Sequence, residues 1–579
     1  MLKCSLTELI LPLTKLFNKI FTTGIYPPQW CEGYICPIFK KGIKDDPSNY
    51  RGITVNSCIG KLFTKILNNR LEKFLDKRGI IRNEQIGFSK GKRTSDHLFI
   101  LRTLAENSTK KGSKPIYACF VDFRRAFDTV WHKGLFFKLR KIGVSDMFYT
   151  ILKDMYRQTK LCVKINDHIT DFFTSNIGVR QGDTLSPNLF KIFLNDFQNT
   201  LDNSCDPVQL SNYKLNCLLY ADDLVLLSSS RHGMQSCIDK LSSYCNNWGL
   251  EVNLNKTKCM TFNALGRIPN YQFSYKNTLI ENVRHISYLG VTISASGHFT
   301  EAKNTLYNKS LKAYFKLCKS FGESKPKIST FFHIFDHTVK PVILYGSEIW
   351  GTFNTNKFNT DGSFYNLCND FILEKLNIKA CRFILGLNKR CTNAAVRGEI
   401  GRFPILFNII INILKYWVRI NESKDPLIKE ALHLSEEIYE SKKDSWLGNV
   451  YKIIEFLGLK KHDILKKKNS IKNIILKKLS FKYSTCWEKE LFNDNRKNPL
   501  QSNKLRTYRL FKPKFCFESY LNLNNQSSRN TLCKFRVGMH KLEIEKGRHL
   551  KIQLSDRICK LCQEEVEDEI HFLLSCKKL

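Results

Sequence analysis

The sequence predicts an α+β fold up to about Trp350, followed by a helical region and a small terminal module of cysteine and histidine residues. Before Trp350, patterns typical of amphipathic helices alternate with short runs rich in β-branched and aromatic residues. After it, helical patterns lead into a lysine-dense section and then into a Cys/His cluster at the end of the chain. No repeat of fixed period appears, which disfavours a solenoid.

The spacing of apolar residues predicts the individual elements of the first part. Helical spacing predicts helices over Leu62–Leu75, Gly134–Tyr156 and Gln235–Trp248. Runs of β-forming residues predict strands within Ile116–Phe123, Leu215–Leu227 and His285–Ile293.

The second part begins with a polar stretch, Thr352–Asn366, whose scattered aromatics are typical of a connector. Further on, Leu459–Lys482 holds nine lysines against one aspartate, and its apolar residues recur at roughly helical spacing. This pattern predicts a basic amphipathic helix. Its lysines form either a solvated helix face or a surface that contacts phosphates, and the sequence leaves both open.

Composition limits the class of protein. At 579 residues the chain has room for roughly three to five folding units. Lysine plus arginine (92) exceeds aspartate plus glutamate (53), which gives a net charge of +39 and indicates a polyanionic partner, most simply nucleic acid. Hydrophobic residues at 42% and aromatics at 12% exclude a disordered basic tail.

The cysteines and the apolar runs bear on the cellular compartment. The 21 cysteines are odd in number and scattered, which is typical of reduced intracellular thiols. Glu8 and Lys15 interrupt the N-terminal apolar residues, so we expect no secretion. The longest apolar run, Phe403–Val418, contains two asparagines and a lysine and is too short to span a bilayer. We expect a soluble protein of the cytoplasm or nucleus with no membrane partner.

Three aspartates are the candidates for chemistry. Asp122 lies at the end of an apolar strand-like run, where an acid is costly unless it binds something. Asp222 and Asp223 lie between two apolar runs, as at the tip of a β-hairpin. Neighbouring carboxylates repel each other, and a divalent cation such as Mg²⁺ makes the arrangement favourable. Two such ions roughly 3.5–4 Å apart can promote in-line phosphoryl displacement. The alternative is that the pair only forms a polar turn.

The segments around these acids resemble a known family. FVDFRRAFD, GVRQGDTLSPNLFKIFLND and YADDLVLL occur in the order and at the intervals of the reverse-transcriptase palm motifs lettered A, B and C. The resemblance is to non-LTR (LINE-type) retrotransposon enzymes, and PIFKKGIKDDPSNYRGITVNSCIGKLFTKIL, WGLEVNLNKTKCMTF, ISYLGVTIS and LYGSEIW reinforce it. It covers about residues 35–350 and implies a right-hand polymerase with fingers, palm and thumb.

The resemblance implies roles for the motif A and C residues. Asp122 and Asp222 match the two metal-binding acids, and Asp223 is their less strictly required neighbour. Phe127 matches the aromatic that packs under the incoming sugar, where a phenyl ring collides with a 2′-hydroxyl, so dNTPs are preferred over rNTPs. The alternative for Phe127 is ordinary core packing. Asp128 is expected to cap the following helix.

Other segments carry implied contacts with the nucleotide. Gln181 and Gly182 resemble the element beneath nucleotide and template, where glycine permits close backbone approach. Lys256 matches the lysine proposed to donate a proton to departing pyrophosphate.

The fingers segment supplies basic residues that would clamp the triphosphate. These are Lys40, Lys41 and Arg51, and the sequence does not say which lysine makes the contact. The alternative is that all three are surface charges.

Three further segments match by order alone. Gly87 and Gly91 form no phosphate loop by pattern and match a stretch ahead of motif A that contacts template. Ile286–Ser294 resembles the primer-grip hairpin, and Thr300–Tyr345 is then a helical thumb.

The C-terminal cluster has the ligand spacing of a zinc site. Cys559, Cys562, His571 and Cys576 suit tetrahedral Zn²⁺ with no open position, hence a structural site. The cluster resembles the Cys-Cys-His-Cys module near the C-terminus of non-LTR elements. Its gap of eight residues departs from the retroviral knuckle, and buried thiols without metal are the alternative.

Together these features divide the chain by expectation into an N-terminal extension with fingers (1–112), palm (113–299), thumb (300–350), connector with helical basic region (351–529) and zinc module (530–579). The implied activity is RNA-directed DNA synthesis from a primer 3′-hydroxyl, with two Mg²⁺, an RNA template, a DNA primer and dNTPs. The alternatives are a decayed or domesticated nucleic-acid-binding derivative and a maturase-like enzyme. The pattern starts within about 35 residues of Met1, so we expect a truncated element copy without an endonuclease.

Overall fold

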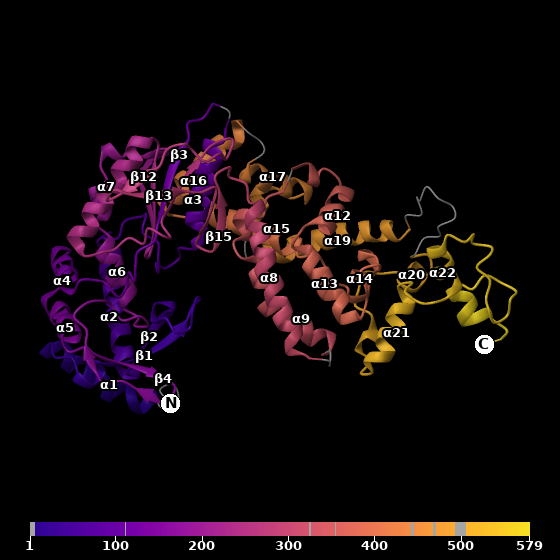
Figure 1. Cartoon of the computed structure of the whole chain (residues 1–579), viewed down its shortest axis with the longest axis horizontal. Coiled ribbons are helices and arrows are strands. Elements are labelled where there is room, and N and C mark those ends of the chain that lie inside the picture. The colour runs from indigo at the N-terminus through magenta and orange to yellow at the C-terminus, as the bar shows by residue number, and fades with distance from the viewer. Residues whose placement is uncertain are drawn as a thin grey trace. The chain divides into compact units, whose positions relative to one another are not determined.

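Figure 1 presents the computed structural model, which describes residues 6–110, 112–322, 326–353, 355–441, 445–466, 470–492 and 505–578. The chain divides into two units. The first consists of Met1–Gly290, Ser294–Gly297 and Lys424–Leu434, and the second of Val291–Ile293, His298–Ser423 and Ser435–Leu579.

The first unit combines helices and strands. Its α-helices are α1 (Leu6–Thr23), α2 (Cys58–Lys77), α3 (Thr94–Ser108), α4 (His132–Lys141), α5 (Asp146–Arg157), α6 (Ser186–Leu194) and α7 (Arg231–Trp248). Its strands are β1 (Glu32–Phe39), β2 (Tyr50–Asn56), β3 (Ile116–Val121), β4 (Lys160–Ile165), β5 (His168–Ile169), β6 (Phe173–Thr174), β7 (Val208–Leu210), β8 (Tyr213–Leu215), β9 (Cys217–Tyr220), β10 (Asp223–Ser228), β11 (Lys258–Phe262), β12 (Phe273–Tyr275), β13 (Thr278–Asn282) and β14 (His285–Tyr288). Short 3-10 helices cover Pro28–Trp30, Pro47–Asn49, Phe197–Thr200 and Asn203–Cys205.

Strand β3 runs through the middle of a six-stranded sheet of order β12-β13-β11-β3-β10-β9. Successive side chains of a strand point to opposite faces. Cys119 and Val121 join the core that also contains Ile238 of α7, and α7 lies beside β12 in Figure 1. Phe120 points to the other face, where its ring centroid lies 5.5 Å from that of Tyr288. Both faces are therefore covered, which is why β3 is apolar throughout.

A second sheet has the order β2-β1-β4-β5, with β6 also paired to β4. Its β1–β2 hairpin pairs Ile38 with Arg51 and brings Lys40 next to the start of β2. Further along the chain, the segment predicted as a primer-grip hairpin contains β14 and β15 (Val291–Ser294), and Leu289 and Gly290 between these strands both have positive φ.

The second unit is helical. Its helices are α8 (Thr300–Ser320), α9 (Ile328–Thr338), α10 (Lys340–Leu344), α11 (Ser347–Trp350), α12 (Asp361–Asp370), α13 (Glu374–Leu385), α14 (Asn393–Ile400), α15 (Leu406–Asn421), α17 (Trp446–Phe456), α18 (Lys461–Lys466), α19 (Ile471–Leu491), α20 (Tyr508–Phe511), α21 (Gln526–Arg536) and α22 (Glu543–Leu550). Single turns of 3-10 helix cover Thr355–Phe358 and Ser519–Asn522, a π-helical turn covers His571–Ser575, and α16 (Pro426–Ser441) has residues in both units.

Two predicted elements differ from the structure. The helix expected over Gly134–Tyr156 is two helices, α4 and α5, because Gly143 adopts a left-handed conformation (φ 80°) that ends α4. The connector expected over Thr352–Asn366 is wrong, since it contains a 3-10 turn and the start of α12. Its aromatics Phe358 and Phe364 are buried and pack together.

The lysine-dense section forms α18 and the first half of α19, while residues 467–469 lie outside the described residues. Ile471, Ile475 and Leu479 are buried along one side of α19, as helical spacing predicts. Within the described ranges, no helix is both long enough and apolar enough to cross a bilayer.

The packing of α7 beneath the sheet leads to the first prediction. Gly233 lies in the first turn of α7, and a Cβ there would come within 2.5 Å of Ser228 Oγ and 2.6 Å of the Cys205 carbonyl oxygen. Although alanine normally stabilises a helix relative to glycine, we expect Gly233→Ala to destabilise the protein by about 1–3 kcal/mol. Gly362→Ala in α12, where no atom lies within 4 Å, should instead be neutral or stabilising by up to about 1 kcal/mol. Urea unfolding of the full chain measures both, and a stabilised Gly233→Ala protein would contradict the packing.

Candidate active site

The three predicted acids lie at one end of the six-stranded sheet. Val121 of β3 pairs with Leu224 of β10, and Asp122 directly follows Val121 while Asp223 directly precedes Leu224. Opposed residues of antiparallel strands have Cα atoms about 4.5–5.5 Å apart, so this register places Asp122 opposite Asp223. Asp222 occupies the two-residue turn between β9 and β10. The structure thus brings Asp122 together with two adjacent acids that lie about 100 residues further along the sequence.

The carboxylates influence one another's ionisation. Desolvation, together with the charges of Asp222 and Asp122, raises the pKa of Asp223 to about 6. Burial also raises the pKa of Asp222; the Asp122 charge adds to this effect, and Arg51 and Lys40 oppose it. The strand ends therefore concentrate negative charge that a cation would stabilise.

Three residues of the segment after α7 bind Asp122. Its Oδ2 accepts a hydrogen bond from Asn253 Nδ2 (3.1 Å) and lies 3.2 Å from Lys256 Nζ. Its backbone N–H donates to Thr257 Oγ1 (3.2 Å), and its carbonyl accepts from the Asn253 N–H (2.7 Å). Lys256 was predicted as a functional residue, but Asn253 was not. The only signal for Asn253 was its place in the NLNKTK segment.

The basic residues of the β1–β2 hairpin differ in their positions. Lys40 and Arg51 are exposed, and their charges lower the pKa of both Asp222 and Asp128, so they face the acidic end of the sheet. Lys41 is the next exposed residue along the hairpin. The hairpin therefore supplies positive charge to the same site as the carboxylates.

Phe127 is half-buried beside this site. Its ring stacks on that of Phe190 in α6, with centroids 4.6 Å apart and planes 18° apart, and Phe88 meets it edge-on at 6.4 Å. Since Phe190 is fully buried, the position of the Phe127 ring is fixed from below by the core.

The segment with Gln181 and Gly182 docks between β2 and the loop after β3. The Gln181 carbonyl accepts from the Thr54 N–H (2.8 Å), and its side-chain amide donates to Asp128 Oδ1 (2.8 Å). A Cβ on Gly182, whose φ is 111°, would lie 2.9 Å from the Thr54 carbonyl oxygen. The predicted capping role of Asp128 is wrong, because Trp131 occupies the N-cap of α4 and Asp128 instead binds Gln181.

The predicted glycines ahead of motif A also differ from each other. Gly87 lies directly against the backbone of Ala221 in the β9–β10 turn, whereas a Cβ on Gly91 would meet no atom within 4 Å.

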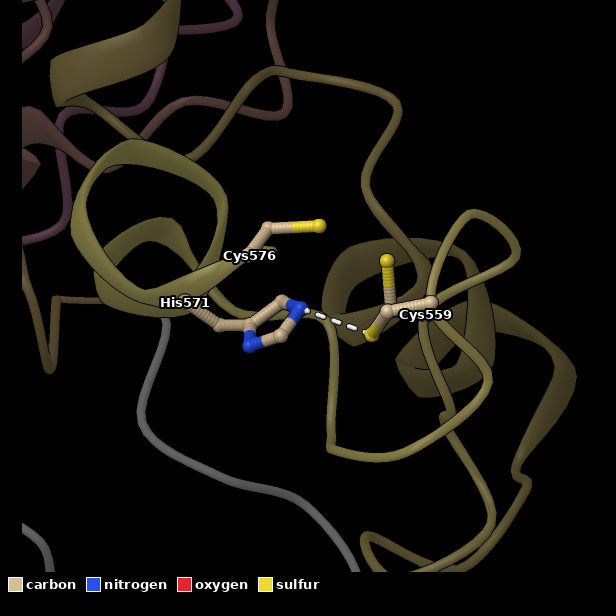
Figure 2. A group of neighbouring side chains, drawn as sticks. Cys559, His571 and Cys576 are labelled. Carbon is tan, nitrogen blue, oxygen red and sulfur yellow. Dashed lines mark hydrogen bonds between the residues drawn. The ribbon is translucent and has the colours of Figure 1, made fainter. Parts of the chain in front are cut away.

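The C-terminal cluster forms a separate site. In Figure 2, the side chains of Cys559, His571 and Cys576 point toward one another. Together with Cys562 they offer ligand atoms that all lie within 4.8 Å of one another, and in the described ranges this is the only such group of three or more.

The ring orientation of His571 suits a tetrahedral metal site. Nε2 faces Cys562 Sγ at 3.3 Å, while Nδ1 lies 3.0 Å from Glu565 Oε2. A carboxylate on the second ring nitrogen is the usual way to orient a metal-binding histidine. Hydrogen bonds from backbone N–H groups, first that of Glu564, lower the pKa of Cys562 to about 7, which favours the thiolate that binds metal.

A comparison with protein families identifies the segment that holds the three acids. The family described as reverse transcriptase (RNA-dependent DNA polymerase) matches residues 38–293. These residues belong to the reverse transcriptase family.

The reverse transcriptase domain has curated relatives in mobile elements. The chain is 28% identical over 384 residues to the probable RNA-directed DNA polymerase from transposon BS of Drosophila melanogaster, covering 62% of this chain and 40% of the relative. It is 24% identical over 351 residues to the RNA-directed DNA polymerase from mobile element jockey of the same species, covering 58% and 37%. The Pol polyprotein from type-1 retrotransposable element R2 of Nasonia vitripennis is 25% identical over 294 residues, covering 49% and 28%. The chain thus spans about two fifths or less of the length of these relatives.

Among solved structures, apo telomerase from Candida tropicalis matches 81% of this chain and 72% of its own, with a TM-score of 0.36 and 13% sequence identity. A C-terminally truncated form of the same protein matches 47% and 55%, with a TM-score of 0.34 and 16% identity.

The repulsion within the acidic site leads to a pH prediction. Because the pKa of Asp223 in the folded chain is about 6, above its ordinary value of 3.8, the folded state binds more protons than the unfolded state between these values. Stability in EDTA should therefore fall as pH rises from about 4 to about 6. Asp223→Asn should reduce this fall and raise the unfolding temperature at pH 7 by about 2 °C, as expected for roughly 0.5–1 kcal/mol after solvent screening.

Thermal unfolding between pH 4 and pH 8 measures the effect. Asp167→Asn, in the exposed β4–β5 turn, is the matched control and should leave the pH profile unchanged. Equal profiles for the Asp223→Asn and wild-type proteins would contradict the electrostatic coupling.

Proposed function

We propose that this chain is an RNA-directed DNA polymerase of a non-LTR retrotransposon, which adds dNTPs to a primer 3′-hydroxyl on an RNA template. The observation that carries the proposal is the meeting of Asp122, Asp222 and Asp223 at one sheet end, inside a segment of the reverse transcriptase family. The relatives in transposon BS and mobile element jockey are described as RNA-directed DNA polymerases, which supports the same activity.

Asp122 and Asp222, with Asp223 beside them, would hold two Mg²⁺, which would supply charge to the attacking and departing oxygens of the phosphoryl transfer. The primer 3′-hydroxyl attacks the α-phosphate, the bond to the β-phosphate breaks, and pyrophosphate leaves. Lys40 and Arg51 bind the triphosphate from the β1–β2 hairpin, with Lys41 as the alternative to Lys40. Lys256 carries a proton at Nζ and donates it to the departing pyrophosphate. Its side chain is 61% exposed, so it can move from its ion pair with Asp122 to the pyrophosphate.

The remaining site residues position the nucleotide. Phe127, supported by Phe190, places its ring where a 2′-hydroxyl would collide with it, which selects dNTPs. Gln181 and Gly182 form the floor beneath the base pair, and Asp128 orients the Gln181 amide.

We further propose that residues 1–112 include the fingers, 113–299 form the palm and 300–350 the thumb, with a helical basic region over 351–529. The surplus of 39 positive charges supports binding of template and primer. Residues 530–579 form a structural zinc module held by Cys559, Cys562, His571 and Cys576.

Primer extension tests the polymerase proposal. We expect Mg²⁺-dependent incorporation of dTTP on poly(rA)·oligo(dT). Asp222→Ala should lower the rate of incorporation at least about 1,000-fold, because it removes one of the carboxylates proposed to bind Mg²⁺. Asp167→Ala is the surface control and should retain activity.

The same assay separates the alternatives. Salt-dependent binding of the duplex without dTTP incorporation by the wild-type protein would favour a decayed nucleic-acid-binding derivative. Equal incorporation by the wild-type and Asp222→Ala proteins would place the active site elsewhere.

Metal analysis tests the zinc module. We expect one Zn²⁺ per chain after dialysis, and none in Cys562→Ser, since a serine hydroxyl is a poor replacement for a thiolate ligand. Cys516→Ser, at an exposed cysteine outside the cluster, should keep its zinc. Zinc content that is the same in both variants would show that the cluster does not bind the metal.

A further inference from the structure

The turn that carries Asp222 has an unusual backbone. Asp223 pairs with Tyr220, so Ala221 and Asp222 are the two central residues of the β9–β10 turn. Ala221 has a φ of 58°, which is a left-handed conformation normally taken by glycine at this turn position. Such a conformation is unfavourable for an alanine and persists where the surroundings enforce it. Ala221 is also buried, so the surroundings can be identified.

A glutamine from the segment ahead of motif A pairs with the backbone of Ala221. The Gln85 side-chain oxygen accepts from the Ala221 N–H (3.1 Å), and its amide nitrogen donates to the Ala221 carbonyl oxygen (3.4 Å). The same side-chain oxygen accepts from the Gly87 N–H (3.1 Å). Gln85 is 2% exposed, so these bonds form away from competing water.

The backbone on either side of Gln85 extends the sheet at its outer strand. The Leu219 N–H donates to the Glu84 carbonyl (2.9 Å), and the Ile86 N–H donates to the Leu219 carbonyl (3.0 Å). Gln85 and Leu219 form a parallel β-bridge. Since β9 is the end of the six-stranded order, the segment covers this edge and fixes the Gln85 side chain at the turn.

Gly87 closes the same contact by its lack of a side chain. A Cβ at Gly87 would lie 2.2 Å from the Ala221 nitrogen, 2.9 Å from its Cα and 3.0 Å from the Tyr220 carbonyl carbon. All three atoms belong to the backbone, so no rotation of a side chain relieves the clash. Position 87 therefore requires glycine, because there is no room for a Cβ atom.

We infer that Gln85 and Gly87 are positioning residues that hold the Ala221–Asp222 turn in the conformation that presents Asp222 to the metal site. The inference rests on the proposed function for the role of Asp222. The contacts of Gln85 and Gly87 with the backbone of Ala221, which we call the bracket, are a feature of the structure itself. An amide suits the position because it both accepts and donates without adding a fourth negative charge beside Asp122, Asp222 and Asp223. The Gln85–Gly87 segment thus acts on the acids through the backbone of Ala221.

Hydrogen exchange measured by mass spectrometry tests the bracket without any need for activity. Gln85→Met keeps the length of the side chain but removes the acceptor, so exchange of peptides covering residues 217–228 should become at least about 10-fold faster. Gly87→Ala should give the same signature. The matched control is Asn188→Met, which removes a buried amide that bonds Asn68 and Glu72 in α2, and it should not speed exchange selectively in the hairpin.

Kinetics distinguish positioning of Asp222 from contact with template or nucleotide. In Gln85→Met we expect kcat to fall about 10- to 100-fold, as for a catalytic group displaced by about 1 Å, with KM for dTTP changed less than about threefold. The Mg²⁺ concentration for half-maximal activity should rise. Ala221→Gly in the Gln85→Met background should restore part of kcat, because glycine adopts the left-handed conformation without support.

The outcomes separate the two proposals. Hairpin exchange that is unchanged in Gln85→Met, or raised equally in Asn188→Met, would overturn the bracket, as would a higher KM with unchanged kcat. Absence of dTTP incorporation by the wild-type protein would overturn the proposed function while the exchange result still decides on the bracket. If Gln85→Met does not fold, Gln85→Asn, which keeps the amide but is too short for both contacts, replaces it with the same expected result.

Discussion

Repulsion between carboxylates is the constraint on which the reverse transcriptase domain depends. The register of β3 and β10 places Asp122 opposite Asp223, and the adjoining turn adds Asp222. Bringing three negative charges together at a partly desolvated strand end is unfavourable unless positive or hydrogen-bonding groups surround them. The chain supplies such groups from separate segments, namely the β1–β2 hairpin and the segment after α7. Much of the local architecture exists to bring these segments to one sheet end.

Local sequence was enough to predict that the three acids meet, because the apolar runs that place them lie directly beside them. Asp122 follows an apolar strand, and the pair Asp222–Asp223 interrupts two apolar runs, so strand pairing alone could place them together. Asn253 and Gln85 were not predicted, since their bonds to Asp122 and Ala221 join residues 131 and 136 positions apart. No periodicity records such a contact. The role of Asp128 was misjudged for the same reason, because its partner lies 53 residues further on.

The errors in the fold have a different cause. Apolar periodicity continues from α4 into α5, and only Gly143, with its positive φ, marks the break between them. Between Thr352 and Asn366 the polar residues outnumber the aromatics, but burial of Phe358 and Phe364 decides the structure. In α19 the prediction was correct, because Ile471, Ile475 and Leu479 follow the helical period on the buried side. Sequence patterns therefore predict single helices and strands better than they predict which residues become buried in the tertiary structure.

The stacking of Phe127 on Phe190 has a consequence for how this protein can evolve. The ring that we propose to exclude ribonucleotides rests directly on a buried ring of the core, with 4.6 Å between centroids. A smaller or polar residue at position 127 would leave the Phe190 face without its partner. Natural variation at these two positions should therefore be correlated, and a lineage that relaxes its choice of sugar would have to repack α6 at the same time.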